Sequence, residues 1–226
     1  MNIEGIPMLE HQLNRIKRCK LVKKIVVATS TDPSDDPIVK LCNDIGVSAY
    51  RGSLHDVLSR VCDAASIFKF DTVVRLTADC PLTESSLIDQ AVSEFQKKDL
   101  DYLSNCRPPT FPDGLDVEVI RLETLRVASE QADIVAHREH VTPYIISAPQ
   151  RFKIGNIENN IDLSAHRWTV DELADFKFVS KVYSSLYNKK MNFTWLDILK
   201  LLEEHPDLIR INSGITRNSS SIKVQQ

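Results

Sequence analysis

The stretch Val73-Val74-Arg75-Leu76-Thr77-Ala78-Asp79-Cys80-Pro81-Leu82 decides the fold, because an apolar, β-branched run stops abruptly at an acid and a proline. The apolar residues of this run show no polar alternation, which is typical of a buried strand with helices on both faces. Pro81 cannot continue a central ladder, so the strand is expected to end near Thr77. Ligands of open α/β sheets bind beyond the carboxyl ends of the strands, which places Asp79 for a metal or a sugar hydroxyl.

Two polar residues of this stretch, Asp79 and Arg75, have alternative explanations. Asp is a favoured N-cap, so capping of a helix that begins after Pro81 explains Asp79 equally well. An uncompensated charge inside a strand is costly, so Arg75 requires a carboxylate partner or must reach the crevice. The first of these, a structural ion pair, is the favoured role of Arg75, and a catalytic role is the alternative.

Short apolar runs and amphipathic helices alternate around this strand. Pro7 fits a first helical position, and apolar residues follow it at helical spacing. The expected elements are a helix from residue 7, a strand at 24–29, a helix from 37, a strand at 47–50, and helices at 55–68 and 87–95. This alternation predicts an α/β fold with a mostly parallel, Rossmann-like sheet and right-handed crossovers.

The alternation changes after Lys98, where three prolines between residues 105 and 114 exclude regular structure. An alternating strand at 115–120 follows, so we expect the segment 105–120 to project from the main sheet. The remaining expected elements are helices at 122–131, 137–146, 172–187 and 194–205, the last with a Thr194–Asp197 capping box, and a strand at 151–157. Residues 1–211 then form one domain, and the serine-rich stretch 212–226 is expected to be a flexible tail.

The composition excludes several classes of protein. With 42% hydrophobic residues, the 226-residue chain has ample material for a core. A net charge of −3 without a basic patch argues against nucleic acid as a partner. The five cysteines have no CxxC spacing, so neither a zinc site nor a disulfide framework is indicated and a cytoplasmic location fits best. No apolar run is long enough for a membrane span, and the N-terminus lacks the order of a secretory signal.

A second acid, Asp171, also follows a short apolar run, Trp168–Val170. Two carboxylates that converge on one crevice suit a divalent cation. Mg²⁺ in particular takes one or two protein carboxylates together with water and phosphate oxygens. The alternative is that Asp171 caps the helix expected from Glu172, and the local sequence taken alone favours that alternative.

Further acids, Asp113, Asp116 and Glu118, come after Pro112. Side chains at i and i+2 share a strand face, so Asp116 and Glu118 could line a pocket for a polyhydroxylated substrate, and a solvated strand face is an equal alternative. The histidines at 137 and 140 lack the spacing of a His-Glu-x-x-His zinc motif. The six glycines form neither a Gly-x-Gly-x-x-Gly motif nor a P-loop, so any nucleotide must be held differently.

Several segments together resemble the nucleotidyltransferases that activate sugars as cytidine monophosphate derivatives. The resemblance is to the branch called spore coat polysaccharide biosynthesis protein F, and it covers most of the chain in consistent order. The matching segments are Ala28-Thr29-Ser30, Asp36-Pro37-Ile38, Arg51-Gly52-Ser53, Asp56-Val57-Leu58-Ser59-Arg60, Val74-Arg75-Leu76-Thr77-Ala78-Asp79-Cys80-Pro81-Leu82, Pro112-Asp113-Gly114-Leu115-Asp116-Val117-Glu118-Val119, Arg138-Glu139-His140-Val141-Thr142-Pro143-Tyr144-Ile145 and Thr169-Val170-Asp171-Glu172.

The resemblance implies a glycosyltransferase-A type domain whose projecting segment supports a homodimer. It implies attack of a sugar hydroxyl on the α-phosphorus of CTP, with pyrophosphate leaving. Asp79 and Asp171 match the two metal-binding acids of the family and would hold Mg²⁺, which orients the phosphates and neutralises developing charge. By the same resemblance, the residues near the nucleotide are Gly52, Ser53 and Asp56, and those facing the sugar are Asp113, Asp116 and Glu118.

One departure from the family concerns the N-terminus. Family members begin with a strand and a loop of the form Ala-Arg-x-Gly-Ser-x-Arg-Leu-Pro-Gly-Lys that wraps the triphosphate. Met1–Leu9 corresponds to the segment after that loop, and Ile6 replaces a lysine often found there. We therefore expect the first strand to be missing from the sheet and nucleotidyl transfer to be impaired. The alternatives are a non-catalytic remnant that acts as a binding or scaffolding subunit, and a glycosyltransferase that uses a nucleotide sugar.

Overall fold

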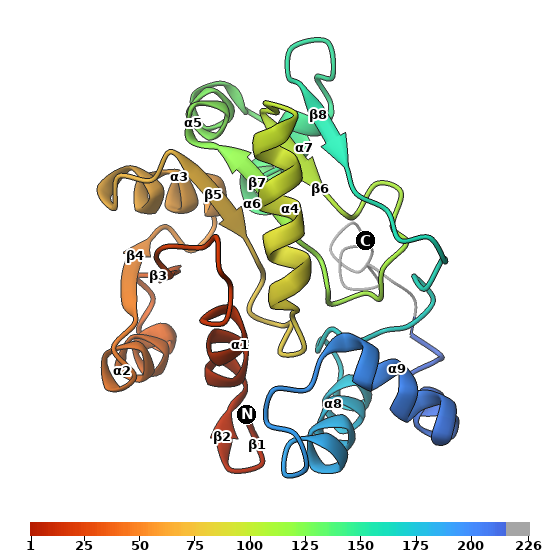
Figure 1. The fold of residues 1–226 in the computed structure, drawn as a ribbon. Helices are drawn as coiled ribbons and strands as arrows, with labels where there is room; N and C mark the ends of the chain where they lie inside the picture. Colours follow the sequence, from red (N-terminus) through yellow and green to blue (C-terminus); the bar gives the residue numbers. More distant parts are fainter. Residues whose placement is uncertain (216–226) are drawn as a thin grey trace.

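A computed structural model describes residues 1–215, which form an α/β fold with helices on both faces of the sheet (Figure 1). The strands are β1 (Asn2–Ile3), β2 (Ile6–Pro7), β3 (Val26–Ser30), β4 (Ser48–Gly52), β5 (Thr72–Arg75), β6 (Tyr102–Ser104), β7 (Glu118–Arg121) and β8 (Ile154–Asn156). The α-helices are α1 (Met8–Ile16), α2 (Asp36–Asp44), α3 (Val57–Ile67), α4 (Ser85–Lys97), α5 (Leu122–Gln131), α6 (Val135–His140), α7 (Pro143–Ile146), α8 (Leu173–Leu186) and α9 (Trp195–Glu204), with short 3₁₀ helices η1 (Pro33–Asp35) and η2 (Leu208–Ile211). The predicted α/β class is confirmed.

The strands form a mixed arrangement rather than the mostly parallel sheet predicted from sequence. β3 and β4 pair in parallel, whereas the four-stranded sheet has the order β5-β7-β6-β8, with β7 antiparallel to both of its neighbours. β6 and β8 are parallel, and β1 and β2 form a small antiparallel pair. The reason for the difference is the connection from β6 to β7, which contains no helix; a direct return of this kind produces antiparallel neighbours.

The strand expected to project from the sheet is instead at its centre. β7 pairs with β5 on one side and with β6 on the other, and Val119 and Ile120 are fully buried. The alternation of Asp116 and Glu118 with apolar residues left open a substrate pocket or a solvated face, but the charge of Glu118 is paired with Arg75 inside the protein. A paired carboxylate can be buried, so polar alternation was a misleading signal at this strand.

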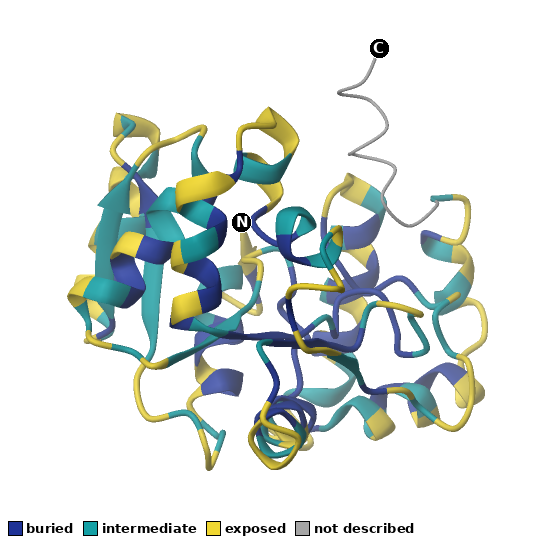
Figure 2. Cartoon of the chain, turned by 90° about the horizontal axis from the view of Figure 1, so that it is seen from above, coloured by how far each residue is buried: buried dark blue, intermediate teal, exposed yellow. Residues whose placement is uncertain are grey.

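Each face of the four-stranded sheet supports its own apolar core. On one face Leu103 and Val119 pack with residues of α4, α8 and α9. On the other face Tyr102 and Ile120 pack with residues of α3 and α5. Buried residues are concentrated along the central strands and on the inward faces of these helices (Figure 2). The expectation of helices on both faces of the sheet is therefore correct.

The strands β3, β4 and β5 are less buried than the centre of the sheet. All four residues of β5 are only half-buried, although the sequence predicted a fully buried strand. Within residues 1–215, β5 pairs only with β7, and β3 pairs only with β4, so each has one unpaired edge. Helix α3 contacts β3 and β4, and its Val61 packs in the same cluster as Val73 of β5. Helix α3 thus packs against strands of both sheets, β3 and β4 in one and β5 in the other.

The helices follow the sequence patterns closely, with one exception. α5 has the predicted bounds, and α9 begins with the predicted capping box between Thr194 and Asp197. The single helix expected around residues 137–146 is split into α6 and α7 at Val141, whose φ is +74°. The break lies at Val141 itself, because a positive φ interrupts the helical backbone there, and Pro143 then occupies the first position of α7, where no amide hydrogen is needed.

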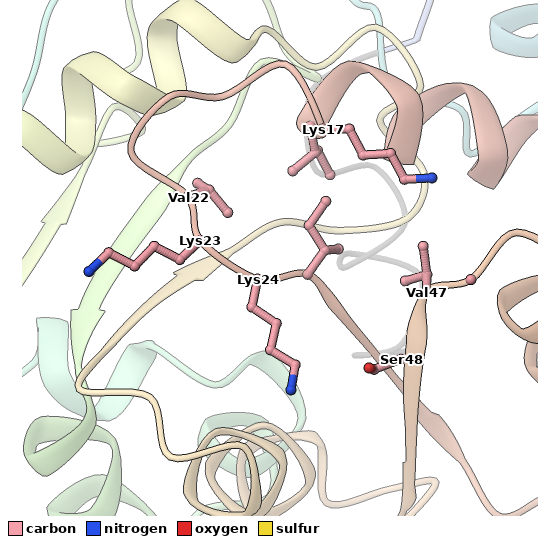
Figure 3. Close-up of a pocket in the computed structure, with 9 residues that line it drawn as sticks. Lys17, Val22, Lys23, Lys24, Val47 and Ser48 are labelled. Atoms are coloured by element: carbon pink, nitrogen blue, oxygen red, sulfur yellow. The ribbon is translucent and has the colours of Figure 1, made fainter.

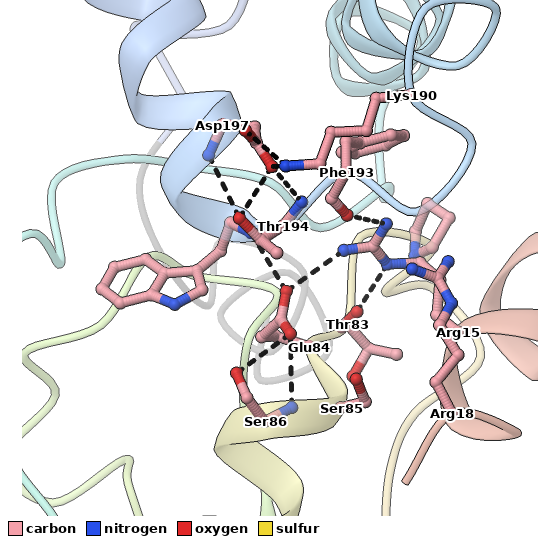
Figure 4. A network of polar contacts seen from close by, with 12 residues as sticks. Arg15, Arg18, Thr83, Glu84, Ser85, Ser86, Lys190, Phe193, Thr194 and Asp197 are labelled. Atoms are coloured by element: carbon pink, nitrogen blue, oxygen red, sulfur yellow. Dashed lines mark hydrogen bonds and ion pairs between the residues drawn. The ribbon is translucent and has the colours of Figure 1, made fainter.

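A buried ion pair joins three helices at the lower part of the molecule as drawn in Figure 1 (Figure 4). Arg15 on α1 lies 3.4 Å from Glu84, and their side chains are 3% and 5% exposed. Arg15 also donates to the carbonyl of Thr83 at 2.6 Å, and Glu84 accepts from the amides of Ser86 at 3.2 Å and Trp195 at 3.0 Å. Glu84 therefore caps α4, contacts the first turn of α9 and neutralises a charge on α1.

Replacement of Glu84 by Gln should destabilise the protein by about 3 to 5 kcal/mol, because it leaves the Arg15 charge buried without a counter-charge. Urea unfolding followed by circular dichroism measures this change. The matched control is Glu204→Gln, which removes an exposed ion pair with Lys200 and should change the free energy of unfolding by less than about 1 kcal/mol. Equal stability of the two variants would contradict the role assigned to Glu84.

The C-terminal part of the described chain packs against the domain. Asn212, which the sequence placed in the flexible tail, is buried and donates to the carbonyl of Arg167 at 2.9 Å. Residues 216–226 of the predicted tail lie outside the described residues. No helix within residues 1–215 has the length and apolar character that a membrane crossing needs.

Candidate active site

The segments that carry Asp79 and Asp171 are neighbours in the fold. The amide of Val170 donates to the carbonyl of Asp79 at 2.8 Å, and the hydroxyl of Thr169 lies 3.5 Å from the same carbonyl. Asp171 is the next residue after Val170, so the two acids stand on adjoining backbone segments beyond the end of β5. This is the placement that a shared cation would require.

Neither acid caps a helix, which removes the alternative explanation for both. The N-cap of α4 is Glu84, so the helix after Pro81 begins well beyond Asp79. The N-cap of α8 is Glu172, whose capping box is completed by Asp175. The helix-capping interpretations of Asp79 and Asp171 are therefore wrong.

A third segment, which begins at Asp113, lies against the Asp171 segment. The amide of Trp168 donates to the carbonyl of Asp113 at 2.6 Å, and Asp113 and Arg167 form a parallel bridge. The next residue, Gly114, has a φ of +106°, and a Cβ there would stand 2.6 Å from the amide of Thr169. Glycine is thus required for both conformation and space, which gives the Pro-Asp-Gly motif a physical reason.

Asp116 is related to the Asp79 segment by its electrostatic effect on the thiol of Cys80. The Cys80 thiol is buried 3.3 Å from the carboxylate of Asp79 and 3.9 Å from the hydroxyl of Thr169. Burial raises the pKa of this thiol, and the charges of Asp79 and Asp116 raise the pKa further. The thiol is therefore a neutral packing group, and the charges of Asp79 and Asp116 both act on it.

The guanidinium of Arg167 forms ion pairs with three acids, Asp171, Asp175 and Asp113. It lies 2.6 Å from Asp171, 2.9 Å from Asp175 and 3.3 Å from Asp113. Burial alone would lower the pKa of Arg167, but its hydrogen bonds to Asp175 and Asp171 raise the pKa above its ordinary value. Arg167 is therefore a permanent positive charge surrounded by three carboxylates.

Arg75 and Glu118 form a separate polar cluster. Arg75 makes the expected ion pair, with Glu118 as its partner across the β5–β7 ladder. Glu118 also accepts from the hydroxyls of Tyr102 at 2.7 Å and Thr142 at 2.8 Å, and it is only 9% exposed. Of the three acids assigned to the sugar, Glu118 and Asp113 are thus held in buried ion pairs, and Asp116 is the half-buried one.

The residues assigned to the nucleotide lie together after the end of β4. The carbonyl of Gly52, its last residue, accepts from the amide of Thr31, and the hydroxyl of Ser53 accepts from the amide of Asp56 at 3.0 Å. Asp56 caps α3 and forms an ion pair with Arg138 at 2.5 Å. These contacts fix the shape of the loop from residue 52 to residue 56.

The acids of the site are of the ligand class that Mg²⁺ prefers. Carboxylate oxygens are the ligands that this hard cation prefers, and the side chain of Asp171 is 27% exposed, which leaves it accessible. No group of three or more His, Cys, Asp or Glu residues suited to a metal occurs within residues 1–215. Mg²⁺ commonly completes its coordination with water and phosphate oxygens, so one or two protein carboxylates are sufficient to hold it.

One pocket of the described residues lies away from these acids. It has a volume of about 370 Å³ and lies at the start of β3 and β4, where Lys17, Lys23 and Lys24 are among its lining residues (Figure 3). The three lysine side chains point in different directions in Figure 3 and do not converge on one point. We therefore keep the acids, and not this pocket, as the candidate site.

Sequence reasoning missed Arg167, Asp175 and Asn212. One signal was available for Arg167, because Arg75-Leu76-Thr77-Ala78-Asp79 and Arg167-Trp168-Thr169-Val170-Asp171 share the pattern Arg-apolar-Thr-apolar-Asp. The two segments are also joined in space by the hydrogen bond between Val170 and Asp79. No sequence signal identified Asn212, which lies in a polar stretch.

Carboxylates gathered beyond a strand end, on an α/β domain that offers an incomplete metal site, are the features of a nucleotidyltransferase. Comparison with known proteins identifies the family of this chain. A protein-family model of cytidylyltransferases matches residues 1–204, and this chain belongs to that family. It is therefore a nucleotidyltransferase enzyme by family.

Individual relatives agree with this assignment. An uncharacterised protein of Methanocaldococcus jannaschii, MJ1063, is 35% identical over 94% of this chain and 86% of its own length. The spore coat polysaccharide biosynthesis protein SpsF of Bacillus subtilis is 25% identical over 88% of this chain and 85% of its own length. The solved structure of a cytidylyltransferase from Leptospira borgpetersenii is 30% identical and superposes with a TM-score of 0.88, over 92% of this chain and 88% of that one.

Proposed function

We propose that this chain transfers the cytidylyl group of CTP to a sugar destined for a surface polysaccharide. The observation that carries the proposal is the hydrogen bond from Val170 to Asp79, which brings the Asp79 and Asp171 segments together. Membership of the cytidylyltransferase family supports the donor. The name of the Bacillus subtilis relative, which refers to spore coat polysaccharide biosynthesis, supports the class of acceptor.

The reaction forms a bond between a sugar oxygen and the α-phosphorus and breaks the bond to the β-phosphate oxygen, so pyrophosphate leaves with the electron pair. Asp79 and Asp171 would hold Mg²⁺, which when bound neutralises charge on the phosphate oxygens. The loop that contains Gly52, Ser53 and Asp56 would contact the nucleotide. Asp116 would bind hydroxyls of the sugar, with Asp113 and Glu118 as buried supports of that side of the site.

Release of pyrophosphate tests this function. The protein is incubated with CTP, Mg²⁺ and a panel of sugars that includes sugar acids, and pyrophosphate is measured with a coupled assay. Pyrophosphate that depends on both CTP and a sugar supports the proposal. Release of a nucleotide from a nucleotide sugar, without pyrophosphate, would favour the glycosyltransferase. Absence of both reactions and of CTP binding by calorimetry, also in protein that carries the family loop upstream of Met1, would favour a non-catalytic subunit.

We further propose that residues 1–226 alone transfer slowly, because their sequence contains no Ala-Arg-x-Gly-Ser-x-Arg loop. We also propose a cytoplasmic location and a homodimer. The location is supported by the cysteines, all five of which are free thiols, and the homodimer by the family resemblance.

A further inference from the structure

We propose that Arg167 is the positioning residue for the carboxylate of Asp171, and that Asp175 and Asn212 hold Arg167 in the orientation this requires. The inference rests on the proposed role of Asp171 in binding a divalent cation. It concerns a buried arginine that does not itself touch the substrate or the cation.

The guanidinium of Arg167 is fixed mainly by Asp175. Its Nε and Nη2 donate to the two carboxylate oxygens of Asp175 at 2.9 and 3.0 Å, which is a bidentate contact. Asp175 is fully buried and also accepts from the amides of Asp171 at 3.2 Å and Glu172 at 3.0 Å. A bidentate pair sets the plane of a guanidinium as well as its place, so Asp175 determines where Arg167 points.

Asn212 fixes Arg167 from the other side. Its amide nitrogen donates both to the backbone carbonyl of Arg167 and to Oδ1 of Asp175, each at 2.9 Å. Asn212 is 5% exposed and comes directly after η2, so the C-terminal segment contributes to the rigidity of the site. Arg167 is thus held through its backbone and through its side chain.

Asp171 receives a different kind of contact. Nη2 of Arg167 donates to Oδ2 of Asp171 at 2.6 Å, a single hydrogen bond in contrast to the bidentate contact with Asp175. Asp171 is also the more exposed of the two acids, with 27% of its side chain accessible against 0% for Asp175. One short bond from a rigid donor orients the carboxylate and leaves it accessible to a cation.

The charges of this cluster explain why the contact does not compete with a cation. One guanidinium faces three carboxylates, those of Asp113, Asp171 and Asp175, so its positive charge is shared and only partly neutralises Asp171. A one-to-one salt bridge would occupy Asp171 and weaken cation binding. Residues that orient a metal ligand in this way typically contribute about 10- to 100-fold to metal affinity.

The test measures the affinity of the whole protein for Mn²⁺ alone, by electron paramagnetic resonance, well below the melting temperature. Arg167→Lys keeps the positive charge but removes the planar guanidinium that makes the bidentate contact with Asp175. It should raise the Kd for Mn²⁺ at least about tenfold. The matched control is Arg121→Lys, which alters an ion pair with Asp99 on the surface and should leave the Kd unchanged. A folded Arg167→Lys protein with the wild-type Kd would overturn the inference, because a merely structural role predicts a lower melting temperature only.

Asn212→Ala provides a second variant that keeps every charge of the cluster. It should raise the Kd for Mn²⁺ by a smaller factor, about 3- to 10-fold, because it loosens Arg167 without removing it. An unchanged Kd in a folded Asn212→Ala protein would contradict the support assigned to this residue. Failure of the proposed function is distinguishable: protein that carries the family loop upstream of Met1 and binds Mn²⁺, but releases no pyrophosphate from CTP with any sugar of the panel, would refute the transferase and leave the positioning role in place.

Discussion

Replacement of Asp79 by Asn should lower magnesium-dependent release of pyrophosphate at least about a hundredfold while the fold persists. The amide retains the size and hydrogen-bonding capacity of the carboxylate, but it loses the charge that attracts a hard cation. The backbone carbonyl of Asp79, which accepts from Val170 and supports the site, is unaffected by the substitution. Turnover is measured in protein that carries the family loop upstream of Met1, and the Kd for Mn²⁺ is measured in residues 1–226.

The control for this experiment is Asp44→Asn, which removes an exposed partner of Lys40 at the end of α2. Its turnover and its Mn²⁺ affinity should equal those of the wild type. Unchanged turnover in Asp79→Asn, with a wild-type melting temperature, would show that Asp79 has no part in the reaction.

Residues 1–226 should release pyrophosphate at least about a hundredfold more slowly than the same chain preceded by a segment that supplies the family strand and loop. Transfer at phosphorus depends mainly on positioning and charge stabilisation, and loss of one preorganised donor costs about 100- to 1,000-fold in rate. The extended protein should also melt at a higher temperature. Within residues 1–215 β3 and β5 each have one unpaired edge, and each buried backbone group left without a partner costs about 1 to 3 kcal/mol.

A third protein separates the two effects of the added segment. It carries the same extension with the loop arginines replaced by alanine and the loop glycines retained. Its melting temperature should match that of the active extension, whereas its rate should match that of residues 1–226. Equal rates and equal melting temperatures for all three proteins would mean that the chain holds the triphosphate by other residues. The prediction concerns residues 1–226 and holds whatever precedes Met1 in the cell.

Local sequence patterns predicted most of the helices, because capping residues and apolar periodicity act within a few residues. The capping box of Thr194 and Asp197 and the bounds of α5 are examples. The arrangement of the strands was predicted less well. The burial of Glu118 in the central strand β7 is possible because Arg75, on a neighbouring strand, neutralises it, and a pairing across the ladder leaves no local mark in the sequence.

The candidate site was predicted in part for the same reason. Asp79 and Asp171 each follow an apolar run, and this signal is local. The partners of Arg167 are not: Asp113 precedes it by a long stretch of chain, and Asn212 comes long after it, near the end of the described residues. Gly114 is similar, since its requirement for a missing side chain arises from the backbone of Thr169, which only the fold brings near.

The hydrogen bond between Val170 and Asp79 also means that binding of a cation by the two acids would be coupled to folding. The two segments are far apart in the chain, so the pair of acids exists in the folded protein and is dispersed in the unfolded one. A ligand that binds only the folded state adds RT ln(1 + [L]/Kd) to stability, or about 2.7 kcal/mol at a concentration of about 100 Kd. The melting temperature of this protein should therefore rise with the logarithm of the divalent cation concentration.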